Sequence, residues 1–364
     1  MTDEPAFTAD GDLESARAAL VAGLDVPALV ERAEQLLLGG PRLFTRAQVA
    51  EQAGMDADRA TALWRALGFA QVGDDEVVFT QRDVDTLIAV RAIEQSGVAD
   101  DELIATMTRI LGQTFSRLAS GQGQLLVSML AQHPEHLESE DGVLAVLGTL
   151  MPLIEQVHEF VWRRQFVAFF NRVATYATSD AAATALVPMA VGFADMSGFT
   201  ALTRRATEAE LGTLLEAFEA TTTDVVSAHQ GRIVKTIGDE VLFVADTPGR
   251  AADIALDLLE RARADERLPA LRIGLASGPV VSRLGDVYGS TVNIASRLTS
   301  LSRPGWVLVD RVMAESLDGD ERYELTSRRP ESVRGFHHLR QWRLRRAGAS
   351  EPRARRRGRT RGRR

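Results

Sequence analysis

The stretch FADMSGFT, residues 193–200, decides the fold of the C-terminal half of this chain. An apolar run ends at Asp195, and the residues from Met196 to Thr200 can open a helix. Backbone N–H groups at such a helix start point toward anions, and the helix dipole favours negative charge there. Asp195 alone is also a common turn or capping residue. The stretch therefore predicts either a surface turn or a phosphate cradle whose carboxylate binds the counter-cation.

Strand and helix patterns alternate on both sides of this stretch. Short apolar runs bounded by turn residues predict strands at 189–196, 231–246, 271–285, 305–310, 322–328 and 336–345. A tight turn at Gly238 and Asp239 divides the second of these into a hairpin. Helical spacing predicts helices at 210–230, 248–264 and 290–302. This alternation indicates an α+β sandwich, a mixed sheet with helices packed on it.

The preceding half, residues 12–176, has a helical pattern. Within it, residues 44–90 predict a helix, a turn, a second helix, a short hairpin at 73–75 and another helix. This segment resembles the winged helix-turn-helix of MerR-type regulators. Its second helix begins with Asp56 and Asp58, whose charge opposes DNA phosphates. We therefore do not expect it to bind nucleic acid.

A long amphipathic helix at 153–176 and a small, polar joint separate the two halves. We expect an all-α domain, a linker helix with its joint, a mixed α/β domain and an arginine-rich tail, at 1–152, 153–187, 188–346 and 347–364. Like charges in the tail repel and cannot form a core, which predicts a disordered segment. Contact of the tail with nucleic acid or an anionic membrane is the alternative.

The composition limits where the chain acts. It contains no cysteine, which excludes disulfides and thiolate metal sites. Its first residues are acidic and lack the pattern of a secretory signal. No apolar run approaches the roughly 18 residues of a membrane span. We therefore expect a cytoplasmic protein with no membrane span.

Asp239 lies in the segment KTIGDEV, residues 235–241. Alone, it is half of a favoured hairpin turn. A hairpin tip beside a strand end can bring its carboxylate close to that of Asp195. Two hard oxygen ligands, with substrate phosphates completing the shell, are what Mg²⁺ accepts, and a pair of ions can activate one oxygen and stabilise another. The two aspartates together therefore indicate a metal site for phosphate chemistry.

Four motifs follow one another in the second half: FADMSGFT, VKTIGDEVLF, GDVYGSTVNIASR and VRGF. In order and spacing they resemble the catalytic domain of class III nucleotidyl cyclases over about residues 187–344. Such an ordered set is more specific than a lone glycine-rich match. The resemblance is to class III adenylate cyclases of the actinobacterial soluble type. It implies a ferredoxin-like mixed sheet with helices and conversion of ATP to 3′,5′-cyclic AMP and pyrophosphate.

The resemblance also implies a role for each motif residue. Asp195 and Asp239 correspond to the ligands of two Mg²⁺ or Mn²⁺ ions, one activating the ribose 3′-hydroxyl and one binding the β- and γ-phosphates. Asn293 corresponds to the residue that orients the ribose. Arg297, four residues later on the same helix face, corresponds to the arginine that stabilises charge on the α-phosphoryl oxygens.

Lys235 and Asp286 correspond to the pair that selects the base. Adenine offers an N6 donor, which Asp286 can accept, and an N1 acceptor, which Lys235 can meet. Guanine presents the reverse pattern, and two mispaired contacts in a dry pocket would reject it. Arg334 aligns loosely with a basic residue that contacts the triphosphate. An ordinary edge-strand arginine is the alternative for Arg334.

The family implies a homodimer through the catalytic domain. Metal ligands come from one subunit, and the base-selecting pair with the helix of Asn293 and Arg297 comes from the other, so a two-fold interface creates two equivalent sites. The helical half resembles the regulatory domain of some actinobacterial relatives. We expect it to restrain catalysis through the long helix. A response to pH through three histidines is a further expectation, carried by His133, His136 and His158.

Two other classes of function remain open. TIGDEV resembles the GGDEF signature of diguanylate cyclases, but only one glycine precedes the aspartate, and STVNIASR has no place in that family. A DNA-binding regulator, or an interaction module built on a degenerate cyclase domain, is the second alternative. The complete set of motif residues argues against degeneracy, because folding alone does not require it.

Overall fold

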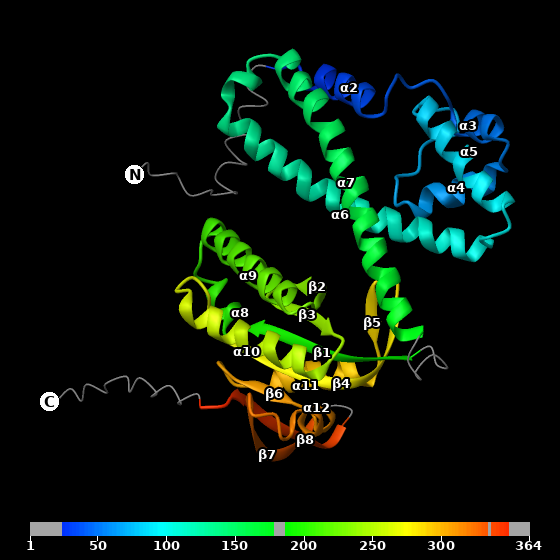
Figure 1. Cartoon of the computed structure of the whole chain (residues 1–364). Helices are drawn as coiled ribbons and strands as arrows, with labels where there is room; N and C mark the ends of the chain where they lie inside the picture. The colour runs from blue at the N-terminus through cyan, green and yellow to red at the C-terminus, as the bar shows by residue number, and fades with distance from the viewer. Residues whose placement is uncertain (1–23, 178–185, 334–335, 349–364) are drawn as a thin grey trace. The chain divides into compact units, whose positions relative to one another are not determined.

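The computed structural model describes residues 24–177, 186–333 and 336–348 (Figure 1). The chain divides into two compact units, Met1–Arg172 and Val173–Arg364. The division falls inside one helix, α7. Residues 349–364 of the predicted disordered tail, and Arg334, lie outside the described residues.

The N-terminal unit is built from helices, as its sequence pattern predicted. Two of them are long, and a short 3₁₀ turn connects these two. Their bounds are α2 Val26–Leu37, α3 Arg46–Ala53, α4 Ala57–Ala66, α5 Gln81–Gln95, α6 Asp101–Gln132, η1 Pro134–Leu137 and α7 Glu140–Ala177.

Helices α3 and α4 form the helix-turn-helix segment. Thr45 caps α3 in a reciprocal capping box with Gln48, which satisfies backbone N–H groups at the helix start. Gly54 ends α3 in the left-handed conformation, with φ 63°, and Asp56 caps α4 two residues later. The small core beneath the turn includes Val49 and Leu63, which are buried.

The predicted hairpin at residues 73–75 is wrong. The segment turns there, with the Glu76 N–H donating to the Gly73 carbonyl at 3.3 Å, but no strand flanks it. Phe79 instead pairs with Phe44 in an isolated antiparallel bridge. Residues 71–78 contain three consecutive acids and a glycine, which leaves too few alternating apolar positions for two paired strands.

Helix α7 is longer and more apolar on its surface than the sequence pattern predicted. It begins at Glu140 and continues through Pro152, so the predicted start near residue 153 lies inside it. Among the described residues it is the one helix long and apolar enough to span a membrane by length and composition, over Glu140–Ala174, which corrects the expectation that no segment reaches that threshold. Much of its apolar surface is exposed, including Phe160 and Phe170.

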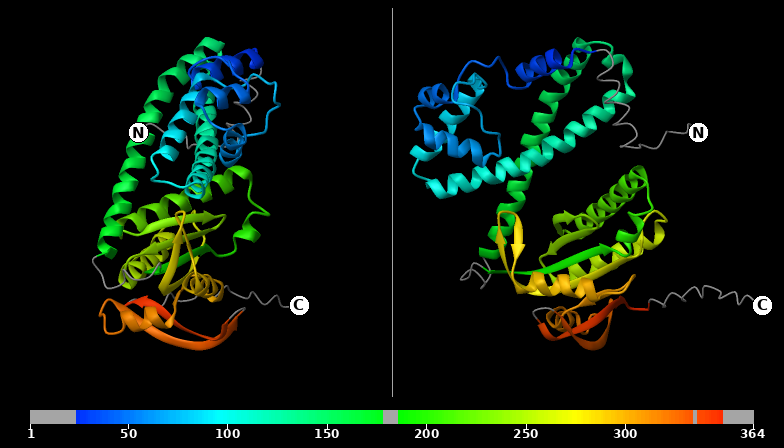
Figure 2. Two further views of the ribbon diagram at one scale, coloured as in Figure 1. Left: turned by 90° about the vertical axis from the view of Figure 1, so that its right-hand side faces the viewer. Right: turned by 180° about the vertical axis from the view of Figure 1, so that it is seen from behind.

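The C-terminal unit contains one mixed sheet, as the fold class predicted. Within the described residues the strand order is β2-β3-β1-β4-β6-β8-β7, with β5 paired to β4, and only the β4–β6 pair is parallel. The β4–β5 hairpin projects from the sheet in both views of Figure 2. The strands are β1 Leu186–Met196, β2 Arg232–Ile237, β3 Glu240–Ala245, β4 Leu271–Arg283, β5 Asp286–Tyr288, β6 Val307–Val309, β7 Tyr323–Val333 and β8 Phe336–Arg346.

Helices cover both faces of this sheet. The larger core packs α9 (Glu208–Ala228), α10 (Pro248–Ala264) and α12 (Arg311–Leu317) on one face. Helix α11 (Ser290–Leu301) covers the other face, and the one-turn helix α8 (Phe199–Leu202) follows β1. Helix α12 and strand β5 were not predicted, because each is too short to show a period.

The alternation of β1 decides which face carries its aspartate. Ala194 and Met196 belong to the α9–α10 core, whereas Val191 and Phe193 belong to the core under α11. Because successive side chains in a strand point to opposite faces, Asp195 lies on the α11 face. Asp195 lies near the end of the strand, beyond the apolar core, where its carboxylate can contact polar groups.

Gly274 lets α11 lie close against β4. A Cβ atom at this position would be 2.2 Å from the Thr299 backbone nitrogen and 2.5 Å from the Ala295 carbonyl oxygen. Both neighbours are helix backbone, so they cannot rotate away as a side chain could. Because α11 carries Asn293 and Arg297, this contact also sets the position of two predicted site residues.

We expect Gly274→Ala to lower the free energy of unfolding by at least about 2 kcal/mol, because α11 must move off the sheet. Gly212→Ala is the matched control. Gly212 lies within α9 with nothing within 4 Å of an added Cβ, so its replacement should raise stability by up to about 1 kcal/mol. Urea unfolding of both variants checks this, and equal stabilities would contradict it.

Candidate active site

The two predicted metal ligands lie in one corner of the sheet. Asp195 is near the end of β1, and Asp239 lies in the two-residue turn between β2 and β3. Gly238 opens that turn with φ 63°, a conformation that glycine adopts without strain. The Met196 N–H donates to the Asp239 carbonyl at 3.1 Å, which joins the turn to the end of β1. The structure therefore brings these two residues together.

A third acid, Glu240, completes a carboxylate cluster with Asp195 and Asp239. Glu240 lies directly opposite Asp195 in the β1–β3 register. Burial, together with the charges of both aspartates, raises the pKa of Glu240 to about 7. The pKa of Asp195 is also raised, first by burial and in smaller part by Asp239. The cluster therefore holds negative charge that favours a cation.

Arg272, which the sequence analysis missed, supplies positive charge to this cluster. It lies at the start of β4, opposite Asp195 in the β1–β4 register. Its Nε–H donates to Asp195 Oδ2 at 2.7 Å, and its Nη2 forms an ion pair with the same oxygen. This contact lowers the pKa of Asp195 and so opposes part of the rise that burial causes. Only the cross-strand register reveals the pair, because 77 residues separate the two positions.

The cluster fits a divalent cation whose remaining ligands come from a substrate. Asp195 Oδ1 is buried, and among the described residues it has no hydrogen-bond partner. An orphaned buried carboxylate oxygen costs free energy that a hard cation would recover. Within the described residues no three His, Cys, Asp or Glu side chains are arranged to hold a metal by themselves. Oxygen atoms of a bound phosphate would have to complete the shell.

Lys235 and Asp286 form an ion pair between β2 and β5. Lys235 Nζ donates to Asp286 Oδ2 at 2.5 Å, and the Val287 N–H donates to Asp286 Oδ1 at 2.8 Å. Burial opposes ionisation of Asp286, but the bonds from Lys235 and Val287 hold its pKa below the ordinary value. The structure therefore places the predicted base-selecting pair side by side, as a fixed donor beside a fixed acceptor.

Lys235 is also the only lysine among 42 basic residues; the other 41 are arginine. An arginine presents a wide planar fork, whereas lysine presents a compact ammonium. A chain that uses arginine at every other cationic position keeps lysine where the smaller group is needed. The residue count alone, without any motif, therefore indicates that Lys235 is a functional position.

Asn293 and Arg297 lie on α11, on the side away from its buried residues Ala295 and Leu298. Asn293 is exposed and Arg297 is half-buried. Across the described parts of the chain, neither side chain has a hydrogen bond or ion pair to another residue. Both are therefore available to a ligand.

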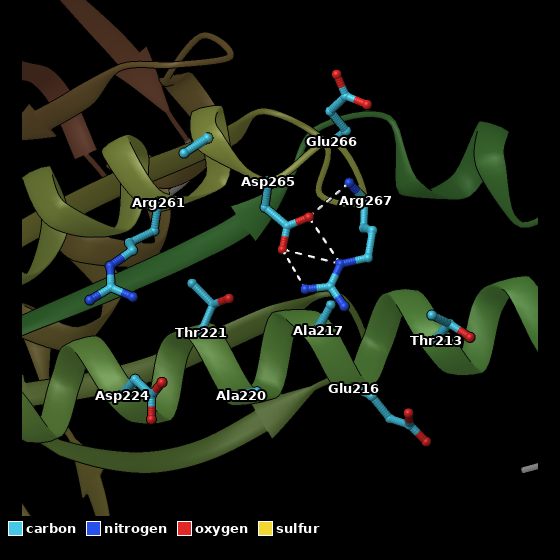
Figure 3. Close-up of a pocket in the computed structure, with 11 residues that line it drawn as sticks. Thr213, Glu216, Ala217, Ala220, Thr221, Asp224, Arg261, Asp265, Glu266 and Arg267 are labelled. Carbon is cyan, nitrogen blue, oxygen red and sulfur yellow. Dashed lines mark hydrogen bonds and ion pairs between the residues drawn. The ribbon is translucent and has the colours of Figure 1, made fainter. Parts of the chain in front are cut away.

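A groove of about 660 Å³ lies elsewhere in this unit, between α9 and the end of α10 (Figure 3). Its lining includes the Asp265–Arg267 ion pair, drawn at the centre of the figure. None of the predicted site residues lines it. Its position therefore separates it from the chemistry of the carboxylate cluster.

Comparison with known proteins gives one family. Residues 182–346 match the model of the adenylate and guanylate cyclase catalytic domain. A protein named adenylate cyclase from Streptomyces coelicolor is 42% identical over 79% of this chain and 75% of its own length. Another from Glutamicibacter nicotianae is 39% identical, over 85% of this chain and 81% of the relative. A Mycobacterium tuberculosis protein named pH-sensitive adenylate cyclase is 31% identical, over 82% and 77%.

Proposed function

Because this chain belongs to the class III adenylate cyclases, we propose that it converts ATP to 3′,5′-cyclic AMP and pyrophosphate. The reaction joins the ribose 3′-oxygen to the α-phosphorus and breaks the bond from that phosphorus to the bridging oxygen of pyrophosphate. The proton of the 3′-hydroxyl is released. ATP is a cytoplasmic substrate, so we place the catalytic unit in the cytoplasm.

The Lys235–Asp286 pair is the observation that carries the choice of base. Asp286 accepts from Val287 and Lys235, and its ionised state leaves acceptor capacity for the adenine amino group. Lys235 can donate a second hydrogen bond to adenine N1. Guanine would set its O6 acceptor against Asp286 and its N1–H donor against Lys235, which leaves two polar groups mispaired. This arrangement supports ATP over GTP and disfavours a diguanylate cyclase.

Asp195 and Asp239 would hold the divalent cations, which we propose are two Mg²⁺ or Mn²⁺ ions. The orphaned Asp195 Oδ1 and the charge of the carboxylate cluster support that assignment. When bound, such ions supply Lewis-acid activation of a hydroxyl and neutralise phosphate charge. Asn293 would orient the ribose, and Arg297 would donate to the α-phosphoryl oxygens as charge develops there.

We propose a homodimer through the catalytic unit. Apolar side chains lie at the tip of β2 and on the β4–β5 hairpin, the two elements that carry the Lys235–Asp286 pair. In an isolated subunit, four of these side chains are 40–56% exposed to water: Ile237, Val281, Leu284 and Tyr288. Exposed apolar groups gathered in one region are typical of an interface. Their position supports a subunit boundary at the base-selecting pair.

The proposed activity is tested with purified full-length chain, ATP or GTP, Mg²⁺ or Mn²⁺, and chromatography of the product. We expect cyclic AMP from ATP and little product from GTP. Asp195→Ala and Asp239→Ala should each lower kcat by about 100-fold or more, since each removes charge that organises the phosphates. Equal activity of these variants and wild type would contradict the metal assignment, and a GTP-derived product would contradict the choice of base.

We further propose that the helical unit restrains catalysis through α7. His158 on α7 lies 2.8 Å from Gln122 on α6, measured between the two Nε2 atoms, so neutral histidine can accept from the amide. A protonated imidazole has no acceptor, so acid would remove this α6–α7 contact. The relative named pH-sensitive adenylate cyclase supports a response of this kind. His133 and His136 lie near η1, where Glu135 accepts from His133.

Activity measured from pH 5 to 8 tests both parts of this proposal. The fragment 186–364 should be more active than the full chain near neutral pH. Acid should raise the activity of the full chain relative to that of the fragment. His158→Gln should flatten that difference, and His133→Gln, at an exposed position, should change it less. A fragment no more active than the whole chain would rule out restraint, and parallel pH curves would rule out sensing by the helical unit.

A further inference from the structure

Two side chains of β2 reach the β4–β5 hairpin. Lys235 forms its ion pair with Asp286, and the Nη1 atom of Arg232 donates to the Gly285 carbonyl at 3.0 Å. The two accepting residues are neighbours in the chain, at the turn where β5 begins. Arg232 lies outside the four motifs that predicted the site. It nevertheless contacts the backbone next to the predicted base-selecting carboxylate.

A β-bulge places both side chains on one face of the sheet. Residues three apart in a regular strand point to opposite faces. The β2–β3 register shifts between Ile233 and Lys235, which inserts one extra residue into β2. Arg232 therefore lies opposite Val244. Lys235 lies opposite Leu242, and both of these β3 partners belong to the core under α11. The bulge thus directs the guanidinium and the ammonium toward the same hairpin.

The turn that Arg232 contacts has an unfavourable backbone conformation. Leu284 and Gly285 connect β4 to β5, with positive φ values of 56° and 82°. This is the pattern of a type I′ turn, whose first position favours asparagine, aspartate or glycine. A leucine in the left-handed region costs free energy, and such a conformation persists only where the surrounding structure holds it. The hydrogen bond from Arg232 is one such restraint.

We propose that Arg232 is a positioning residue for base selection: it holds the β4–β5 turn so that Asp286 stays beside Lys235. This inference rests on the proposed function, in which that pair reads the edge of adenine. The geometry allows little movement, because each group must meet its base atom at about 2.9 Å. A displaced turn would carry the Asp286 carboxylate away from the base and leave the carboxylate cluster in place.

Other roles for Arg232 make a different prediction. If the hydrogen bond only stabilised the hairpin, its loss would lower activity with ATP and with GTP by the same factor. If Arg232 bound a nucleotide phosphate, its loss would again affect both equally, because the two share the same triphosphate. A positioning role changes the ratio between the two bases. The carbonyl that Arg232 contacts precedes Asp286 directly, which favours this role.

The test is the ratio of kcat/KM for ATP to that for GTP, measured on the full-length chain. Arg232→Ala should lower this ratio about 10-fold, with the loss mainly on ATP, since a displacement of about 1 Å can cost up to about 100-fold. Arg232→Lys should restore part of it, because an ammonium can still donate to the carbonyl. Arg263→Ala is the matched control and should leave the ratio unchanged. The Nη2 atom of Arg263 also donates to a glycine carbonyl, that of Gly305, at 3.0 Å.

Binding of 3′-deoxy-ATP and 3′-deoxy-GTP, which cannot cyclise, separates failure of this proposal from failure of the proposed function. Equal binding of the two by wild type would overturn the choice of base, and the positioning role with it. A preference for 3′-deoxy-ATP without any cyclic AMP formed from ATP would overturn the proposed reaction alone, and the binding ratio would then decide the role of Arg232.

An adenine preference that Arg232→Ala leaves unchanged would overturn the positioning role alone. If that variant does not fold, Arg232→Met decides by the same ratio, because it keeps much of the alkyl chain and removes every donor.

Discussion

The antiparallel register of β1 with its two neighbours is the constraint on which the site depends. It sets Asp195 opposite Glu240 on one side and opposite Arg272 on the other. A shift of one residue would turn Asp195 toward the α9–α10 core, where a charge would be buried without a partner. The apolar residues that precede it on β1 fix this register, because each alternate side chain fills one of two cores. Packing of the sheet therefore positions the carboxylate.

The carboxylates of Asp195, Asp239 and Glu240 lie close together at this corner of the sheet and repel one another. Arg272 offsets part of the repulsion, and a pKa near 7 lets Glu240 remain partly protonated at neutral pH. A divalent cation would offset the remainder. The hairpin of β2 and β3 has two roles, since it carries Lys235 on one strand and Asp239 at its turn. Among the described contacts none joins the Lys235–Asp286 pair to the carboxylate cluster, and in the proposed homodimer a second subunit would bring such groups to one nucleotide.

Much of the C-terminal unit was predictable from residue patterns, whereas its cross-strand contacts were not. Apolar alternation and turn residues located the long strands, and motif order gave the family and the aspartates. Arg272 was missed because strand register is a tertiary property, and α12 and β5 are too short to show a period. In the N-terminal unit, the pattern of residues 44–90 predicted the helix-turn-helix, which the structure caps at Thr45 and Asp56, but residues 73–75 were mistaken for a hairpin turn. The apolar surface of α7 was underestimated, because polar residues interrupt the run that a sequence count requires.

Complementation between two inactive variants tests most directly the central claim that one nucleotide is held by carboxylates of one subunit and base-reading groups of another. Asp195→Ala lacks a proposed metal ligand, and Arg297→Ala lacks the arginine proposed to stabilise charge on the α-phosphate. The two variants are unfolded, combined in equal amounts and refolded together. Half of the dimers should then contain one subunit of each variant, and each such dimer has one intact site. We predict about a quarter of wild-type activity, although each variant alone is inactive. No recovery, in a mixture shown to contain mixed dimers, would contradict the account.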